Sequence, residues 1–535
     1  MNGKLSNFIF IAVICLVIFN CANRGTPSGG DKDETPPVIV KSIPKNNSIN
    51  FKAKEIKIYF DEYIKLNDIQ KQLIISPPMD PEPEITPLGL ASKYITIKIN
   101  DTLQENTTYA INFGTSIVDN NEGNPYPYYR YVFSTGNYID SLSIGGYIKN
   151  ALEREPDDFV SVMLYEVNDT FNDSIIYKQK PKYITNTLDS TTTFKLENLK
   201  AGKYVMIALK EENGNYTFQQ KTDKIAFIKS VITAPTDSIY ELNLFKEIPD
   251  FKAVRPNLVS GNKIAFGYEG DAKDMTIELL SQTSANFKNV ITKETDKDTL
   301  NYWYKPNFEA DSLMFKISNH NYEETFKVNL RDLKKDTLII KPIEANTLKL
   351  LDDFQLQGST PFAVIDENKI TILDKDSIKV PFTTTLDKFN NIYKFNFDKT
   401  EENVYKIQML PGTFTDFFEN KNDTLSFNAR TKAQIDYGDI RVNLQNVIYP
   451  VIVQLVDQKN EIETEQYIED GSKPIDFLSL TPGKYFIRVV FDTNKNKTYD
   501  PGNYLKKIQP ERVSYYPEEI EVRSYSEQII AFTLQ

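Results

Sequence analysis

The chain has 535 residues, which is too many for one hydrophobic core and predicts several domains. Its formal net charge of −12 excludes nucleic acid as an expected partner, because binding phosphates needs a basic surface. Aromatic residues make up 12% of the chain, with 31 Tyr and 33 Phe, and this composition favours strands joined by polar turns. We therefore expect an all-β protein.

The first 20 residues have the pattern of a signal peptide. Lys4 precedes an apolar run from Phe8 to Phe19, which at about a dozen residues is too short to span a bilayer. The run ends just before Cys21, and a flexible tether rich in Gly and Ser follows over residues 21–35. This arrangement resembles a bacterial lipoprotein signal, in which the cysteine becomes the lipidated N-terminus. The alternative is an ordinary secretory signal, with Cys21 either buried or removed.

Lipidation of Cys21, for example with palmitate, implies a chain that is held on a membrane and does not span it. The resemblance implies the outer membrane of the cell envelope, and it leaves open whether the protein faces the periplasm or the cell surface. Cys15, the other cysteine, lies inside the apolar run and is interpreted as hydrophobic filler. The mature chain is then expected to lack disulfides and to rely on apolar cores.

Residues 36–138 are predicted to form the first β-domain. Ile56, Ile58 and Phe60 alternate with polar neighbours, and this period of two is typical of a strand with one buried face. A Leu-x3-Thr-Thr-Tyr segment ending at Tyr109 follows. After it come the turn Asp119-Asn-Asn-Glu-Gly-Asn and a closing strand with the sequence Tyr-Val-Phe-Ser-Thr-Gly.

These motifs resemble the bacterial Ig-like domain family of surface-layer proteins, over roughly residues 36 to 137. Together with the tether, the chain is similar to the Ig-like domain lipoproteins of Bacteroidota. The resemblance implies a β-sandwich and brings no shared catalytic residues. Within it, Gly123 is expected to supply a turn conformation and Asp119 to bind the turn backbone.

A sequence repeat defines two further domains, at residues 139–247 and 434–535. Leu199-Lys-Ala-Gly-Lys-Tyr204 and Leu480-Thr-Pro-Gly-Lys-Tyr485 each follow a Gly-x-Ile strand start and an apolar strand. Both copies resemble the transthyretin-like modules of carboxypeptidase regulatory regions. In those modules the glycine turns the chain and the tyrosine packs back on the sandwich.

The middle of the chain is predicted to add two more sandwiches. Residues 248–344 have strand patterns that leave the type of sandwich open, with Thr337–Ile340 as one expected strand. Residues 345–433 resemble the first domain again, because Tyr405 through Thr431 parallels Tyr109 through Thr135. We therefore predict a tandem array of Ig-like and transthyretin-like β-sandwich domains behind a lipoprotein signal.

Catalytic motifs are scarce in the sequence, and we expect a protein that is not an enzyme. The single histidine, His320, lies between two predicted strands and is interpreted as a loop residue. The chain has no Gly-x-Ser-x-Gly elbow and no phosphate-binding glycine loop. Adjacent carboxylates such as Asp157 and Asp158 point to opposite faces of a strand and make poor acid/base pairs. A hydrolase stays open as an alternative.

The best candidate for a metal site is a loop in the last domain. Asp492, Asn494, Asn496 and Asp500 alternate with other residues, and such converging oxygens suit calcium. Lys497 stands where a calcium loop has glycine, so the alternative is a polar turn that caps its own backbone. No other cofactor is expected.

Two aromatic clusters are candidates for sugar stacking. They are Tyr126–Tyr131 and Tyr302–Tyr304, the second of which holds the only tryptophan, Trp303. The alternative is that both clusters pack strand faces or domain joints. For the whole protein we expect a structural or adaptor role, with contacts to another envelope protein or an extracellular polymer. A glycan- or peptide-binding module is the alternative.

Overall fold

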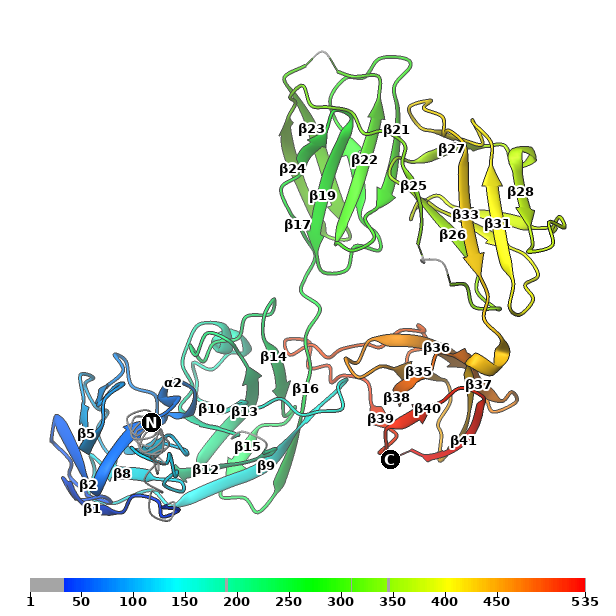
Figure 1. The fold of residues 1–535 in the computed structure, drawn as a ribbon. Helices are drawn as coiled ribbons and strands as arrows, with labels where there is room; N and C mark the ends of the chain where they lie inside the picture. The colour runs from blue at the N-terminus through cyan, green and yellow to red at the C-terminus, as the bar shows by residue number, and fades with distance from the viewer. Residues whose placement is uncertain (1–32, 188–190, 309, 344–346, 535) are drawn as a thin grey trace, which may run out of the picture. The chain divides into compact units, whose positions relative to one another are not determined.

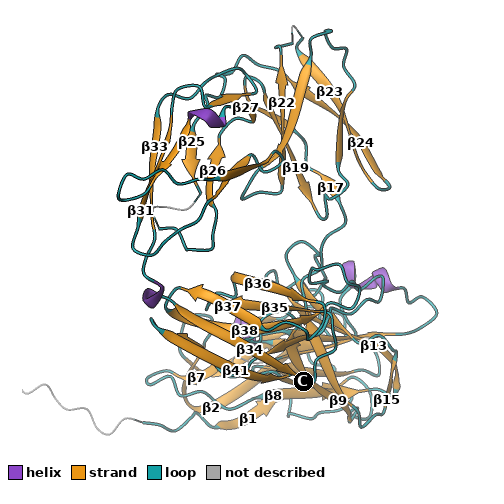
Figure 2. Ribbon diagram, turned by 90° about the vertical axis from the view of Figure 1, so that its right-hand side faces the viewer, coloured by secondary structure: helices purple, strands orange, loops and turns teal. Residues whose placement is uncertain are grey.

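The computed structural model describes residues 33–187, 191–308, 310–343 and 347–534, and its secondary structure is almost entirely β (Figure 2). The helices in these ranges are short: α2 (Ile69–Gln72), η1 (Asp173–Tyr177), η2 (Glu367–Lys369) and η3 (Gln434–Asp436). The all-β prediction is confirmed. The chain divides into two compact units, the first holding the chain up to Ser143 with segments 182–188 and 196–201, and the second holding the rest.

The first sandwich lies in the first unit. Its strands are β1 (Ile39–Ile43), β2 (Glu55–Leu66), β3 (Ile74–Ser76), β4 (Glu84–Thr86), β5 (Ser92–Lys98), β6 (Thr108–Asn112), β7 (Ile117–Asp119) and β8 (Arg130–Ser134). One sheet has the order β1-β2-β5-β4 with β7 also on β2, and the other has the order β3-β6-β8 (Figure 1). Ile56, Ile58 and Phe60 are buried between the sheets, as their alternation predicts.

The second sandwich follows the first in the chain. Its strands are β9 (Leu142–Asn150), β10 (Ser161–Glu166), β11 (Tyr183–Asn186), β12 (Thr193–Leu199), β13 (Gly202–Lys210), β14 (Lys224–Phe227), β15 (Ile232–Ala234) and β16 (Ile239–Leu244). The sheet orders are β11-β10-β13-β14, with β15 on β13, and β12-β9-β16.

The fifth sandwich repeats this topology at the end of the chain. Its strands are β34 (Gly438–Gln445), β35 (Val451–Val456), β36 (Ile462–Ile468), β37 (Ile475–Leu480), β38 (Gly483–Phe491), β39 (Val513–Tyr515), β40 (Ile520–Val522) and β41 (Ser526–Thr533). The orders are β36-β35-β38-β39, with β40 on β38, and β37-β34-β41. In both sandwiches the last strand runs parallel to the first, β16 along β9 and β41 along β34. The sequence repeat is therefore a repeat of topology.

The Leu-x-x-Gly-x-Tyr motif forms the same tight hairpin in both copies. β12 ends at Leu199 and β13 begins at Gly202, and the second copy matches this spacing. The rings of Tyr204 and Tyr485 are buried and lie over their glycines: a Cβ on Gly202 would be 3.1 Å from the Tyr204 hydroxyl. The tyrosine ring therefore packs against the glycine in both copies, more tightly at Gly202 than at Gly483, where a Cβ would lie 3.5 Å from the nearest Tyr485 atoms.

The third sandwich holds β17 (Lys252–Ala253), β18 (Asn257–Ser260), β19 (Lys263–Glu269), β20 (Thr276–Leu279), β21 (Lys288–Lys293), β22 (Thr299–Lys305), β23 (Ser312–Asn319) and β24 (Tyr322–Asn329). Its sheets are β17-β19-β22-β21, with β18 on β19, and β20-β23-β24. The strand expected at Thr337–Ile340 begins only at Ile340. Ile340 pairs with Gly358 of the fourth sandwich, so the assignment of this strand to the third domain was wrong.

The fourth sandwich holds β25 (Ile340–Pro342), β26 (Phe354–Gly358), β27 (Phe362–Ile365), β28 (Ile370–Leu373), β29 (Thr383–Asp387), β30 (Ile392–Asn396), β31 (Val404–Met409), β32 (Phe414–Asp416) and β33 (Leu425–Arg430). The orders are β25-β26-β30-β29, β28-β31-β33 and β27-β32. The first two orders correspond to the two sheets of the first sandwich. The first, third, fourth and fifth sandwiches each bury a hydrophobic cluster drawn from their own stretch of chain.

Candidate functional site

The predicted lipidation site, Cys21, lies outside the described residues. Within the ranges that the structure describes, no helix is long and apolar enough to cross a membrane.

The predicted calcium loop is a hydrogen-bonded turn. The Asp492 carboxylate is 1% exposed and accepts hydrogen bonds from the backbone N–H of Asn496 (3.1 Å) and Lys497 (2.9 Å). The side-chain amides of Asn494 and Asn496 donate to Asp500, the second at 2.9 Å. These oxygens therefore face N–H donors of their own loop. Among the described residues, no group of three or more His, Cys, Asp or Glu is placed to hold a metal ion.

Glu511 is a member of this loop network that sequence reasoning missed. Its carboxylate accepts hydrogen bonds from the backbone N–H of Thr493 (2.7 Å) and of Asp500 (3.2 Å). Glu511 lies outside the alternating motif, so spacing alone does not identify it. The calcium assignment stays a prediction, and the hydrogen bonds favour the alternative of a self-capping turn.

Trp303 is buried at the joint of the third and fourth sandwiches. Its side chain is 3% exposed, and its Nε1 donates to Thr292 Oγ1 at 2.9 Å. The Phe418 ring of the fourth sandwich stands edge-on, 6.1 Å between centroids, and Lys263 Nζ lies 4.8 Å from the indole ring. Stacking on a sugar needs an accessible ring face. The burial of Trp303 therefore weakens the glycan interpretation of this cluster and supports the domain-joint alternative.

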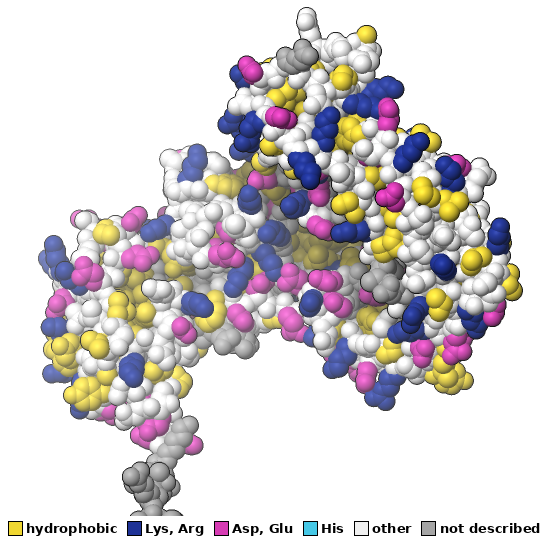
Figure 3. Space-filling model, turned by 45° about the horizontal axis from the view of Figure 1, so that its top comes forward, with side chains coloured by type: hydrophobic (Ala, Val, Ile, Leu, Met, Phe, Trp, Pro, Cys, Tyr) yellow, Lys and Arg dark blue, Asp and Glu magenta, His cyan; other side chains and the backbone are white. Residues whose placement is uncertain are grey.

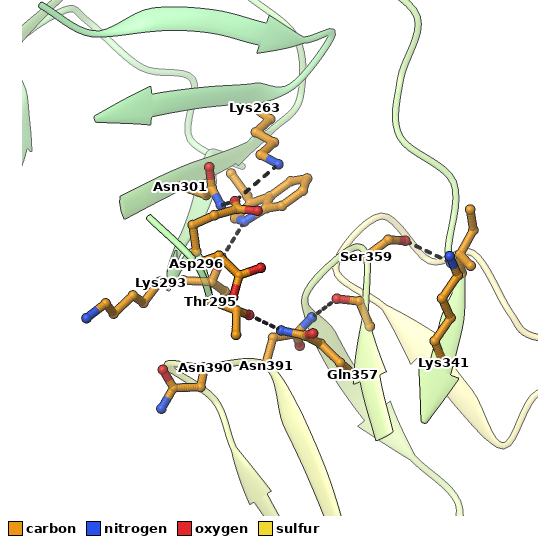
Figure 4. Close-up of a pocket in the computed structure, with 15 residues that line it drawn as sticks. Lys263, Lys293, Thr295, Asp296, Asn301, Lys341, Gln357, Ser359, Asn390 and Asn391 are labelled. Atoms are coloured by element: carbon orange, nitrogen blue, oxygen red, sulfur yellow. Dashed lines mark hydrogen bonds and ion pairs between the residues drawn. The ribbon is translucent and has the colours of Figure 1, made fainter. Parts of the chain in front are cut away.

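A polar cavity of about 340 Å³ lies beside Trp303 (Figure 4). Much of its lining is engaged within the protein: Asn301 donates to Glu294 at 2.6 Å, and Gln357 donates to Thr295 across the joint at 2.6 Å. The cavity therefore lies at a polar contact between the third and fourth sandwiches, and much of its lining is already hydrogen-bonded.

The Tyr126–Tyr131 cluster is divided between the core and the surface. Tyr129 and Tyr131 are buried, and the Tyr131 hydroxyl donates to the Pro44 carbonyl at 2.8 Å. Burial raises the pKa of Tyr131 to about 12. Tyr126 packs against Tyr129 at 5.9 Å, while Tyr128 is 56% exposed. The cluster does not present its rings as one surface.

Two aspartates cap corresponding turns in the first and fourth sandwiches. Asp119 Oδ1 accepts from the N–H groups of residues 121, 122 and 123 at 2.7 to 3.1 Å, and its Oδ2 accepts from that of residue 124 at 2.8 Å. Although burial tends to raise the pKa of Asp119, these donors hold it below its usual value. Gly123 has a φ of 81°, as expected for its turn role. Asp416 similarly accepts from the N–H groups of Phe418 and Asn420.

A buried tyrosine is also shared by these two sandwiches. The Tyr109 hydroxyl accepts from the N–H of Gln104 at 2.9 Å, and the Tyr405 hydroxyl accepts from the N–H of Thr400 at 2.7 Å. In both cases the acceptor lies five residues after the donor. These contacts agree with the predicted parallel between Tyr109–Thr135 and Tyr405–Thr431.

His320 and the acidic pair at Asp157 have ordinary structural surroundings. His320 is exposed in the β23–β24 turn, with its Nε2 3.2 Å from Asp274. Asp157 accepts hydrogen bonds from Lys224 Nζ and from Asn150. On the face drawn in Figure 3, lysine, arginine and acidic side chains intermingle without a large field of one sign.

A contact between the second and fifth sandwiches was not predicted. Tyr504, from the long loop after β38, is fully buried; its N–H donates to Glu247 at 2.5 Å and its hydroxyl to Asp173 at 3.2 Å. Its ring meets Phe227 edge-on at 5.3 Å. Burial raises the pKa of Tyr504, and the carboxylate of Asp173 raises it further.

Further residues of the fifth sandwich extend this contact, which we call the clasp. Lys507 Nζ lies 2.6 Å from Asp173, and the Tyr515 hydroxyl donates to the Leu152 carbonyl at 2.8 Å. Arg488 Nη1 donates to the same carbonyl at 3.0 Å. The loop of the second copy is longer than that of the first. That difference in length is the sequence feature that could have pointed to the clasp.

Residues 33–135 match the family model described as "Bacterial Ig-like domain". This match agrees with the resemblance predicted for residues 36 to 137, and it covers less than half of the chain. No curated protein matches the chain.

Among solved structures, the chain is similar to domains 1–6 of the surface layer protein SbsC, with 10% identity and a TM-score of 0.16 over 91% of this chain and 67% of that one. BcpA, the major pilin subunit of Bacillus cereus, has 10% identity and a TM-score of 0.14 over 74% of this chain and 99% of that one. An I-band fragment of titin has 12% identity and a TM-score of 0.12 over 53% and 98%. At these scores the likeness carries no argument about function.

Proposed function

We propose that this chain is a lipid-anchored envelope protein with a structural or adaptor role, exerted through protein contacts. The observation that carries this proposal is the clasp. Side chains of the fifth sandwich make buried polar and aromatic contacts with the second sandwich, between residues such as Tyr504 and Asp173 that are far apart in the sequence. Contacts of this kind hold domains in a defined arrangement, which a scaffold or an adaptor requires.

The joint at Trp303 supports the same role. Trp303, the single tryptophan of the chain, packs one sandwich on the next. Lys305 Nζ also lies 2.9 Å from Glu419 across this joint. Aromatic packing and ion pairing between sandwiches thus serve the architecture of the array.

Anchoring through Cys21 is part of the proposal and has a matched internal control. Cells expressing the chain are labelled with an alkyne analogue of palmitate, and the purified protein is probed for the label. We expect Cys21→Ser to abolish labelling and Cys15→Ser to leave it unchanged. Equal labelling of the wild type and Cys21→Ser would exclude the anchor at this residue.

The protein-contact role is tested by isolating the full-length protein from native envelopes and identifying what accompanies it by mass spectrometry. We expect one other envelope protein to accompany the chain in a stoichiometric amount. This partner should stay bound to the wild type through a wash that removes it from the Cys21→Ser variant, which is the control. Finding no protein above background would contradict the adaptor role and favour an extracellular polymer as the partner.

A further inference from the structure

The outer face of the β1-β2-β5-β4 sheet carries a partly exposed aromatic row. Lys41 on β1 pairs with Tyr59 on β2, and Tyr59 pairs with Tyr94 on β5. Directly paired residues point to the same side of a sheet, and the opposite side of these strands is the apolar core. At about 4.8 Å per strand, the row crosses about 10 Å of the sheet surface. We call Lys41, Tyr59 and Tyr94 the tyrosine row.

The side chains of the tyrosine row are in contact with each other; Lys41 and Tyr94 are exposed, and Tyr59 between them is half-buried. The Tyr59 and Tyr94 rings lie 5.8 Å apart at an interplanar angle of 43°, and Tyr94 is 45% exposed. Lys41 Nζ lies over the Tyr59 ring, 5.0 Å from its centroid. Next to this row on the same face, Ile43 is 54% exposed. One exposed and one half-buried aromatic ring beside an exposed aliphatic side chain form an apolar platform on this face.

Two lysines on this face are paired with carboxylates. Lys57 lies 3.1 Å from Glu55, and Lys98 lies 3.3 Å from Glu84. Lys41 has no carboxylate within ion-pair distance in the part of the chain that the structure describes; its interaction is with the Tyr59 ring. Lys93 is placed similarly, with its Nζ 5.3 Å from the centroid of the Tyr63 ring, and the Asp61 carboxylate near it accepts the Val38 N–H. The face therefore presents two ammonium groups that lie over aromatic rings and form no ion pair with the described residues.

The fourth sandwich shows that this fold does not require the tyrosine row. Its β26 and β30 correspond to β2 and β5 in the sheet order, and their outward pairs are Gln355 with Lys394 and Gln357 with Ile392. Thr385 on β29 continues that row. The two sandwiches share their capping aspartate and buried tyrosine but differ on this face. The tyrosines are thus a property of the first sandwich and not of its topology.

The geometry points to a binding surface for an acidic polysaccharide, a partner whose chemistry matches both parts of the row. Tyrosine rings pack against the C–H faces of sugar rings, and an unneutralised ammonium group binds a carboxylate. A neutral polymer would leave Lys41 without a counter-charge, and a simple anion would not use the aromatic rings. This inference does not depend on the protein-contact role.

The test uses residues 22–535, which contain every residue that the structure describes. Binding is measured by affinity electrophoresis through gels containing polygalacturonate, a carboxylated polysaccharide, or dextran, a neutral one. Tyr59→Thr and Tyr94→Thr keep β-forming residues in the strands. Tyr138→Thr and Lys45→Gln are the matched controls, since both residues are exposed in the first unit and lie outside the row. Melting temperatures confirm that each variant is folded.

We expect polygalacturonate to retard the wild type, and each tyrosine variant to weaken binding about tenfold or more. Lys41→Gln should weaken binding severalfold and reduce its dependence on salt, because one ion contact is lost. Equal retardation by dextran, equal binding of row and control variants, or no retardation by polygalacturonate would overturn the proposal. Preferential flotation with phosphatidylglycerol vesicles, lost in Tyr59→Thr, would overturn it in favour of a membrane surface.

Discussion

Replacing Asp119 with alanine should open the turn that follows β7. In the wild type its carboxylate accepts four backbone N–H groups, from residues 121 to 124, at 2.7 to 3.1 Å. The carboxylate itself is buried, while residues 121 to 123 are exposed. After the substitution, water can reach the freed N–H groups, and this limits the loss.

The magnitude follows from these contacts. Net contributions of hydrogen bonds to a charged group are about 1.5 to 3 kcal/mol each when buried, and solvent access to the donors reduces their sum well below the additive value. We expect a loss of about 2 to 3 kcal/mol in the free energy of local opening, which corresponds to about 30- to 150-fold lower protection. Asp119→Asn keeps one acceptor oxygen and should cost about 1 kcal/mol.

Hydrogen exchange followed by mass spectrometry measures this opening peptide by peptide in the full-length protein. Peptides covering residues 117–134 should lose protection in Asp119→Ala, and those covering residues 404–430 should not. Asp416→Ala should give the reverse pattern, since it caps the corresponding turn of the fourth sandwich. A change below about threefold in the first peptide, or equal changes in both, would refute the capping argument.

The same carboxylate predicts a pH dependence. The folded-state pKa of Asp119 is lowered, so its contribution to stability is present above the unfolded value of about 3.9 and is lost as the pH falls through the folded value. In Asp119→Asn this acid-induced loss should be absent from the first sandwich. Identical acid profiles of the two proteins in peptides 117–134 would contradict the assignment.

The remaining predictions concern the joints and the loop of the last domain. Phe418→Ala should increase acrylamide quenching of the single tryptophan, Trp303, because a ring that packs against it is removed. Tyr525→Ala, at an exposed ring of the fifth sandwich, is the control, and equal quenching in both variants would contradict the joint. Tyr504→Ala should destabilise the clasp by about 3 to 5 kcal/mol. The loss should be seen as faster hydrogen exchange in peptides covering residues 173–177, and unchanged exchange there would contradict the contact. Calcium should leave the melting temperature of the protein unchanged if the Asp492 loop is a turn; a rise that Asp500→Asn abolishes would establish the metal site instead.

Local patterns predicted much of the fold because their causes are local. The alternation of Ile56, Ile58 and Phe60 follows from one buried sheet face. The Asp119 turn depends on atoms within five residues of each other. The spacing of Gly202 and Tyr204 reflects a ring that packs closely against the glycine.

The joints could not be predicted from such patterns. On β22, Tyr302 and Tyr304 face the core of the third sandwich, and Trp303 between them faces the other way. From its sequence position, an outward tryptophan is a candidate for ligand stacking; in the structure Phe418, far along the chain, packs against it. Tyr504 is similar, because its partners Asp173 and Phe227 belong to another sandwich.

The measurement that tests the proposed role most directly is the mass of the assembly that contains the full-length protein after gentle extraction from native envelopes. A structural or adaptor protein should migrate in a complex heavier than one chain, and cross-linking before extraction should place the partner on defined residues of the sandwiches. Migration as a single chain, with no cross-linked protein, would contradict the account.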